Sequence, residues 1–255
     1  MGGSEIFRAK VLDVEPKLSV GDTLGRTFSI YRDQAGVLLP VAFWLFLAVS
    51  VIEALGAGNL GLGLIALVVS LAASTLYQGT VVGLVSDVQD GRRDNSVGEL
   101  MRSVAPVVMP LIGAGIVSAL GIVFGLVLLV VPGLYLLTIW AVIAPVIVVE
   151  RRGVFDAFGR SRQLVRGSGW PVFWTVVVSF LITFVAALVF AAIAVALSEG
   201  ILVEIVLLTL AATFTAPIPA LVASVIYFRL LELRGKPPAS DSSASAAAPE
   251  PPAAS

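Results

Sequence analysis

The sequence predicts an all-α polytopic membrane protein with six transmembrane helices that pair into three hairpins. Three observations predict this fold class. Apolar residues make up 58% of the 255 residues and charged residues only 13%, whereas an average soluble domain has about 25% charged residues. Six apolar runs are long enough to cross a hydrocarbon core of about 30 Å as helices. Under this interpretation all 16 Lys and Arg residues lie on one side of the membrane.

The six runs follow one another as three closely linked pairs. They are expected at residues 37–55, 61–85, 105–131, 134–149, 171–197 and 201–230. The links within the pairs read GAGN, VPG and SEG, and links this short join antiparallel neighbours. The sixth run is too long for one straight crossing. We expect a kink at Pro217 and Pro219, because proline removes a backbone donor and clashes with the preceding turn.

The distribution of basic residues predicts the orientation of the chain. The three short links carry no Lys or Arg, whereas all of them lie in the segments before, between and after the pairs or, for Arg229, at the inner end of the sixth run. The positive-inside rule then places both termini in the cytoplasm. The first 36 residues contain no short apolar segment with a small-residue cleavage site, so we expect no cleaved signal peptide. The predominance of Arg over Lys suggests a bacterial protein, located in the cytoplasmic membrane.

Three regions follow from this reading. Residues 1–18 form an N-terminal cytoplasmic segment, residues 19–235 the six-helix membrane domain, and residues 236–255 a cytoplasmic tail. The tail consists largely of Pro, Ala and Ser, a composition that buries too little apolar surface to offset the entropy of ordering. We therefore expect the tail to be disordered.

A short repeat precedes each hairpin. The segment GVFDAFGR at 153–160 aligns without gaps on SVGDTLGR at 19–26, and SVGELMR at 96–102 is a third copy with one deletion. The spacing of Ser and acid in the two Ser-containing copies is that of a capping box, which starts a helix. Each copy is expected to form a short amphipathic helix in the membrane interface. In the last copy, Val154, Phe155, Phe158 and Val165 form the predicted apolar face.

Five arginines around the last copy are the main candidate site: Arg151, Arg152, Arg160, Arg162 and Arg166. The structural interpretation is a topology signal and interface device, with Trp170 as an interface anchor. The functional interpretation is a site for phospholipid head groups or a phosphorylated ligand. The planar guanidinium fork bonds two phosphate oxygens at once.

Polar residues inside the spans are the second group of candidates. Glu53 and Glu204 lie near the outer ends of their spans, where a carboxylate reaches the interface; alternatively, they face each other or a water-filled cavity in an ion or proton path. Gln78 and Tyr77 lie deeper in the second span, and we expect them to form interhelical hydrogen bonds. Gly121 and Gly125 fit the close-packing pattern GxxxG, for which we favour packing within the chain over dimerisation.

The sequence resembles a broad group of bacterial six-helix membrane proteins, which includes the membrane domain fused to some glycerophosphodiester phosphodiesterases. The resemblance covers roughly residues 18–235 and depends on VPGLY at 131–135, Ala144-Pro145, Glu150, AFGRS at 157–161, LVRG at 164–167 and Trp170. It implies an all-helical membrane module connected with lipid or envelope physiology. In the fused proteins a separate soluble barrel carries the chemistry, so the resemblance does not imply phosphodiesterase activity here.

The residue types present exclude several kinds of active site. The sequence contains no Cys and no His, which excludes thiolate nucleophiles, Cys/His zinc sites and haem bound by His. No phosphate-binding loop is present, and the basic residues lack the interleaved aromatics that are typical of nucleic-acid binding.

We therefore predict a non-catalytic membrane protein without a cofactor. It is expected to bind membrane lipids, anionic lipids included, or protein partners in the membrane through its inner Arg-rich helices, and not to bind nucleic acid. The alternative is a small transporter or channel, suggested by the proline-broken sixth run together with Glu53 and Glu204.

Overall fold

The computed structural model describes residues 18–89, 98, 104–197 and 200–235, and in this part of the chain the regular structure is helical, without strands. Six helical segments are long and apolar enough to cross a membrane: Ala35–Gly56, Leu60–Gln89, Ala105–Leu128, Val130–Glu150, Gly169–Leu197 and Ile201–Leu233. They confirm the six predicted spans, each within a few residues of the expected ends. The chain is an all-α, multi-pass integral membrane protein.

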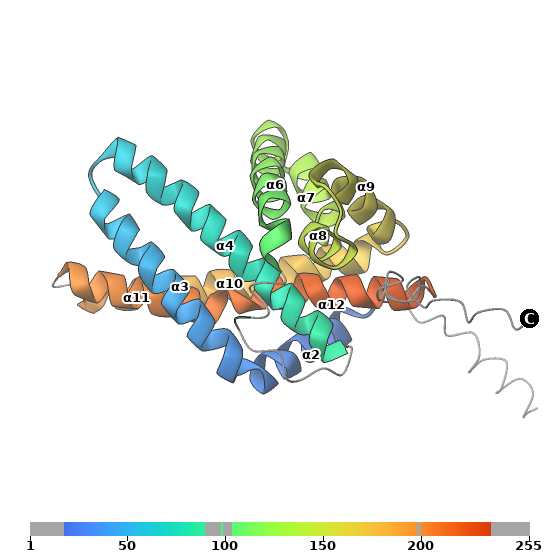
Figure 1. The fold of residues 1–255 in the computed structure, drawn as a ribbon, viewed down its shortest axis with the longest axis horizontal. Coiled ribbons are helices and arrows are strands. Elements are labelled where there is room, and N and C mark those ends of the chain that lie inside the picture. The colour runs from blue at the N-terminus through green and yellow to red at the C-terminus, as the bar shows by residue number, and fades with distance from the viewer. Residues whose placement is uncertain (1–17, 90–97, 99–103, 198–199, 236–255) are drawn as a thin grey trace, which may run out of the picture.

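The spans pair as three antiparallel hairpins (Figure 1). These are α3 (Ala35–Gly56) with α4 (Leu60–Gln89), α6 (Val108–Leu128) with α7 (Val130–Ile139), and α10 (Gly169–Leu197) with α11 (Ile201–Thr215). A short 3-10 helix at Ala105–Val107 leads into α6. In Figure 1 the tips of the hairpins lie apart at the left and top of the view, on the side away from the end of the last helix, α12 (Pro217–Leu233).

The core of the protein surrounds α12. Most of its side chains are buried, including Leu221, Ile226, Tyr227 and Leu230, and it contacts α2 (Val20–Asp33), α4 and α10. The hairpin tips, in contrast, expose many large apolar side chains. Exposed apolar surface is unfavourable in water but not in lipid, because hydrocarbon chains are as apolar as the side chains themselves.

Two of the six spans are broken near their middle. The sixth is interrupted at Ala216, between α11 and α12, at the position where Pro217 was expected to disturb the helix. The fourth is interrupted between α7 and α8 (Ile143–Glu150), a break that the sequence analysis did not predict. Pro145 lies in the first turn of α8, the part of a helix that tolerates a residue without an N–H.

Each break is tied to a helix outside the spans. The hydroxyl of Ser161, on α9 (Val154–Val165), donates a 2.7 Å hydrogen bond to the carbonyl of Ile139 at the end of α7. The hydroxyl of Tyr31, on α2, donates a 3.2 Å bond to the carbonyl of Phe214 at the end of α11. Burial raises the pKa of Tyr31, so its hydroxyl keeps the donated proton. Carbonyls that a helix end leaves without a partner are thus satisfied.

The first and last copies of the repeat form α2 and α9. The hydroxyl of Ser19 caps α2 by accepting from the N–H of Asp22 at 3.4 Å, as the capping-box spacing predicted. The middle copy, residues 96–102, lies outside the described residues except for Gly98, as do the N-terminal segment up to residue 17 and the tail from residue 236.

The residues of the predicted apolar face of α9 differ in burial. Phe155 is 82% exposed, whereas Ala157, Ser161 and Leu164 are fully buried. The helix packs against α6, α7, α8 and α12, and the small side chains of Ala157 and Ser161 allow that close approach. Packing against neighbouring helices, rather than the largest apolar residues, therefore sets the rotation of α9. Its location in the membrane interface stays a prediction.

Candidate functional site

The five arginines of the candidate site do not form one cluster. Two of them surround Glu150, the last residue of α8. The Nε of Arg160 lies 2.9 Å and 3.0 Å from the two carboxylate oxygens of Glu150, and the Nε of Arg152 lies 2.7 Å from one of them. The hydroxyl of Tyr227 on α12 donates to the same carboxylate at 3.3 Å.

This ion-pair cluster is partly withdrawn from solvent. The side chain of Glu150 is 13% exposed and that of Arg160 is 19% exposed, whereas Arg152 is 45% exposed. The carboxylate pairs with both guanidinium groups, so that it offsets one of their two charges, and it joins α8, α9 and α12 in one hydrogen-bonded network. Arg152 and Arg160 are therefore occupied by a protein carboxylate, which makes them poor candidates for an external phosphate.

Arg151 has a different role. It ends α8 in the left-handed backbone conformation, at φ 52°, and its side chain is exposed. Glycine favours this conformation and terminates many helices in it. The backbone of Arg151 turns the chain from α8 towards α9, independently of its charge.

The remaining two arginines, Arg162 and Arg166, line a groove of about 490 Å³. Its other lining residues are Tyr135 and Ile139 on α7 and Gln163, Val165, Gly167 and Gly169 at the end of α9 and the start of α10. Both arginines are exposed. Among the described residues, no acid forms an ion pair with either of them.

Arg234, just after α12, fixes the end of α9 beside this groove. Its guanidinium group donates to the backbone carbonyls of Gln163, Leu164 and Arg166. A cation at a helix C-terminus satisfies the last carbonyls and opposes the negative end of the helix dipole. Gly167 then turns the chain into α10 with φ +91°. The backbone that carries Arg162 and Arg166 is therefore held in place from a distant part of the sequence.

Aromatic residues follow the groove directly. Trp170 and Trp174, in the first turns of α10, are exposed. Exposed Trp at the start of a span is typical of the level where lipid head groups meet the hydrocarbon. Along the chain, Arg166 of the groove lies about one helical turn before Trp170.

The polar residues predicted within the spans also lie in different surroundings. Gln78 lines a second cavity, of about 430 Å³, while its neighbour Tyr77 makes an interhelical hydrogen bond of 3.1 Å to the carbonyl of Leu38. Glu53 and Glu204 are exposed near the tips of their hairpins. Neither carboxylate belongs to the lining of the two cavities just described.

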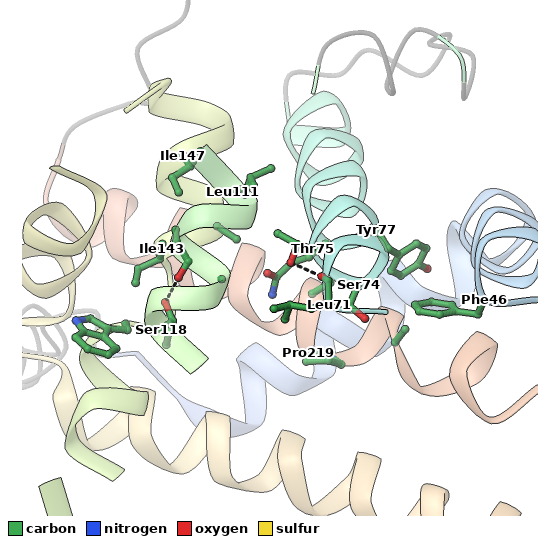
Figure 2. A pocket seen from close by; sticks show the side chains of 18 residues that line it. Phe46, Leu71, Ser74, Thr75, Tyr77, Leu111, Ser118, Ile143, Ile147 and Pro219 are labelled. Atoms are coloured by element: carbon green, nitrogen blue, oxygen red, sulfur yellow. Dashed lines mark hydrogen bonds between the residues drawn. The ribbon is translucent and has the colours of Figure 1, made fainter. Parts of the chain in front are cut away.

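The second cavity lies halfway along the spans, where the two broken helices meet α4 and α6 (Figure 2). Its polar lining consists of Ser74, Thr75, Tyr77, Gln78, Ser118 and Trp140. Of these residues, only Tyr77 and Gln78 were candidates from the sequence. The Ser and Thr residues were visible in the apolar runs, but hydroxyls in a helix usually bond back to their own backbone and give no separate signal.

Comparisons of the chain with protein-family models, with curated proteins and with solved structures found no match. The resemblance to the membrane domain of glycerophosphodiester phosphodiesterases therefore stays a prediction.

Proposed function

We propose that this integral membrane protein is a non-catalytic module of the bacterial cytoplasmic membrane that binds the phosphate of anionic phospholipids. The binding site is the groove between α7 and α9. The observation that supports this most directly is that Arg162 and Arg166 line one groove, exposed and with no acid paired to them among the described residues.

The groove lining combines polar and apolar side chains. Arg162, Arg166 and the amide of Gln163 offer several N–H donors, while Ile139 and Val165 are apolar. Phosphate oxygens suit the guanidinium donors, because charge-assisted bonds are about twice as strong as neutral ones. The acyl chains of the same molecule suit the apolar side chains. A phospholipid therefore matches both kinds of lining residue, whereas a free phosphate matches only the polar ones.

Catalysis is not part of the proposal. The groove contains guanidinium groups, an amide and the phenol of Tyr135, but none of its lining residues has a carboxylate or imidazole that could act as general base. Among the described residues no group of three or more His, Cys, Asp or Glu side chains gathers to hold a metal.

Lipid retention in native mass spectrometry tests the proposal. The full-length protein is extracted in mild detergent and incubated with equal amounts of phosphatidylglycerol and phosphatidylcholine. The double variant Arg162→Gln/Arg166→Gln is expected to lose phosphatidylglycerol selectively. Each arginine near a membrane surface contributes about 1 kcal/mol to the binding of anionic lipid. Losing both should therefore lower the affinity on the order of 30-fold.

The matched control removes two arginine charges outside the groove. Arg32 and Arg151 are both exposed and lie outside the groove, so Arg32→Gln/Arg151→Gln should retain phosphatidylglycerol. If both double variants lose the lipid equally, the effect is one of net charge and the groove is not a site. Unchanged retention in the groove variant would also refute the proposal.

The alternative, a small transporter or channel, retains one supporting observation. Broken helices often frame transport sites, and both breaks border the cavity beside Gln78. The exposed positions of Glu53 and Glu204 do not support an ion path through that cavity. Glycerol flux in liposomes that contain the protein tests this alternative.

A further inference from the structure

The cavity halfway along the spans is a second site, distinct from the groove. The break in the fourth span contributes Trp140 and Ala141 to its lining, and the break in the sixth contributes Ala216 and Pro219. Gln78 lies on α4, near the middle of that helix. Figure 2 shows labelled lining side chains from α3, α4, α6, α8 and the start of α12.

The lining carries polar groups but no charge. Its 18 residues include hydroxyls, an amide and an indole, and none is Asp, Glu, Lys or Arg. A charged molecule in these surroundings would lose its hydration without gaining a counter-charge, which is strongly unfavourable at this depth. The cavity therefore suits an uncharged occupant.

The hydrogen bonds of the lining hydroxyls further restrict which uncharged molecules fit the cavity. The hydroxyl of Thr75 donates to the carbonyl of Leu71 at 2.7 Å, and that of Ser118 donates to the carbonyl of Ala114 at 2.6 Å; both bonds are drawn in Figure 2. With their hydrogens directed at the backbone, these two oxygens are available only as acceptors. An occupant that bonds to them has to bring its own O–H or N–H donor.

The access route points to the lipid phase. Ser74 belongs to the cavity lining and is exposed in the middle of α4, and the large side chains of Leu67 and Val68, up to two turns before it, are exposed too. At that depth the surroundings of a membrane protein are acyl chains. A molecule entering beside Ser74 therefore comes from the bilayer.

From these observations we infer that the cavity binds the hydroxyl-bearing head of an uncharged lipid, with its acyl chains remaining in the bilayer. A volume of about 430 Å³ lies within the roughly 300–1,000 Å³ range of small-molecule pockets, enough for such a head but not for a whole lipid. This inference is independent of the phosphate-binding groove, since the two sites share no lining residue.

Photolabelling with diacylglycerol tests the inference. The full-length protein is reconstituted in phosphatidylcholine liposomes with a diazirine-bearing diacylglycerol, and labelling is measured with and without excess unlabelled diacylglycerol. Competable labelling of the wild-type protein is expected. A second probe, identical except that its hydroxyl is acetylated, should label several-fold less, because it has no donor for Thr75 and Ser118.

A matched pair of variants on α4 locates the site. Thr75→Val and Thr80→Val each remove a buried hydroxyl that bonds back to a carbonyl of the preceding turn, and only Thr75 lines this cavity. Thr75→Val is expected to reduce competable labelling about fivefold, the effect of one neutral hydrogen bond, and Thr80→Val to leave it unchanged. Ser118→Ala, on another helix, should repeat the Thr75→Val result.

Three labelling results would overturn the inference: no competable labelling, equal labelling by the acetylated probe, or equal effects of Thr75→Val and Thr80→Val. A fourth is glycerol flux through the protein in the same liposomes, if Thr75→Val changes the flux and leaves the labelling unchanged. The last result would identify the cavity as a solute path. The groove variant Arg162→Gln/Arg166→Gln should keep full diacylglycerol labelling. The lipid-retention experiment therefore tests the groove alone, and the labelling experiment tests the cavity alone.

Discussion

At the scale of single residues, Glu150 decides which arginines are available. It lies next to Arg151 and Arg152 in sequence, yet its carboxylate bonds to Arg152, Arg160 and Tyr227 and not to Arg162 or Arg166. One carboxylate thus divides a run of like charges into a pair held within the protein and a pair directed at the groove.

Replacing Glu150 by Gln is expected to destabilise the protein by about 2–3 kcal/mol. Removing one partner from a buried ion pair leaves the others without a counter-charge, which generally costs about 3–5 kcal/mol, and the partial exposure of Arg160 reduces that figure. Thermal unfolding in detergent measures the effect. Arg152→Gln is the control and should cost less than about 1 kcal/mol, because Arg152 is the more exposed partner. Equal losses for both variants would contradict this account of the cluster.

At the scale of secondary-structure elements, glycine positions determine how closely the second hairpin packs. A Cβ on Gly121 would lie 2.7 Å from the indole ring of Trp140, and one on Gly125 would lie 3.0 Å from the Cα of Gly133. Both glycines of the GxxxG pattern therefore face α7 and the break after it, within the same chain. This agrees with the packing role that we favoured over dimerisation, and it places the Trp140 ring at the edge of the central cavity.

Gly121→Ala is expected to destabilise the protein by about 1–3 kcal/mol, the usual cost of inserting a methyl group into a packed contact. Gly159→Ala on α9 provides a control of opposite sign. A Cβ at Gly159 meets nothing within 4 Å, and alanine favours a helix over glycine by up to about 1 kcal/mol. Chemical or thermal unfolding in detergent compares the two. A stabilising Gly121→Ala would show that α6 and α7 do not pack as described.

At the scale of the whole molecule, the three hairpins spread their tips apart while their other ends meet around α12 (Figure 1). Both sites depend on this arrangement. The groove forms where the second hairpin meets the start of the third, and the cavity forms where the first two hairpins meet α8, the break at Ala216 and the start of α12. Neither site can form on one hairpin alone.

The orientation of the molecule in the membrane stays a prediction, and the absence of native Cys makes it directly testable. Asn59 lies in the link of the first hairpin and Asp156 lies on α9, and both are exposed. With a membrane-impermeant maleimide, Asn59→Cys is expected to react in intact spheroplasts, and Asp156→Cys only after lysis. The reverse pattern would invert the topology that the positive-inside rule predicts.

The sequence by itself determined the number of spans, their pairing into hairpins, the break at Pro217 and the Ser19 cap, because hydropathy, link length, proline and capping act between near neighbours in the chain. Tertiary structure alone decided that Glu150 occupies Arg152 and Arg160, since the hydroxyl of Tyr227 that completes this network lies 77 residues away. It also decided the exposure of Phe155 and the polar cavity beside Gln78. These features depend on how far each helix is rotated about its axis, and that rotation is set by the fit of side chains between helices remote in sequence.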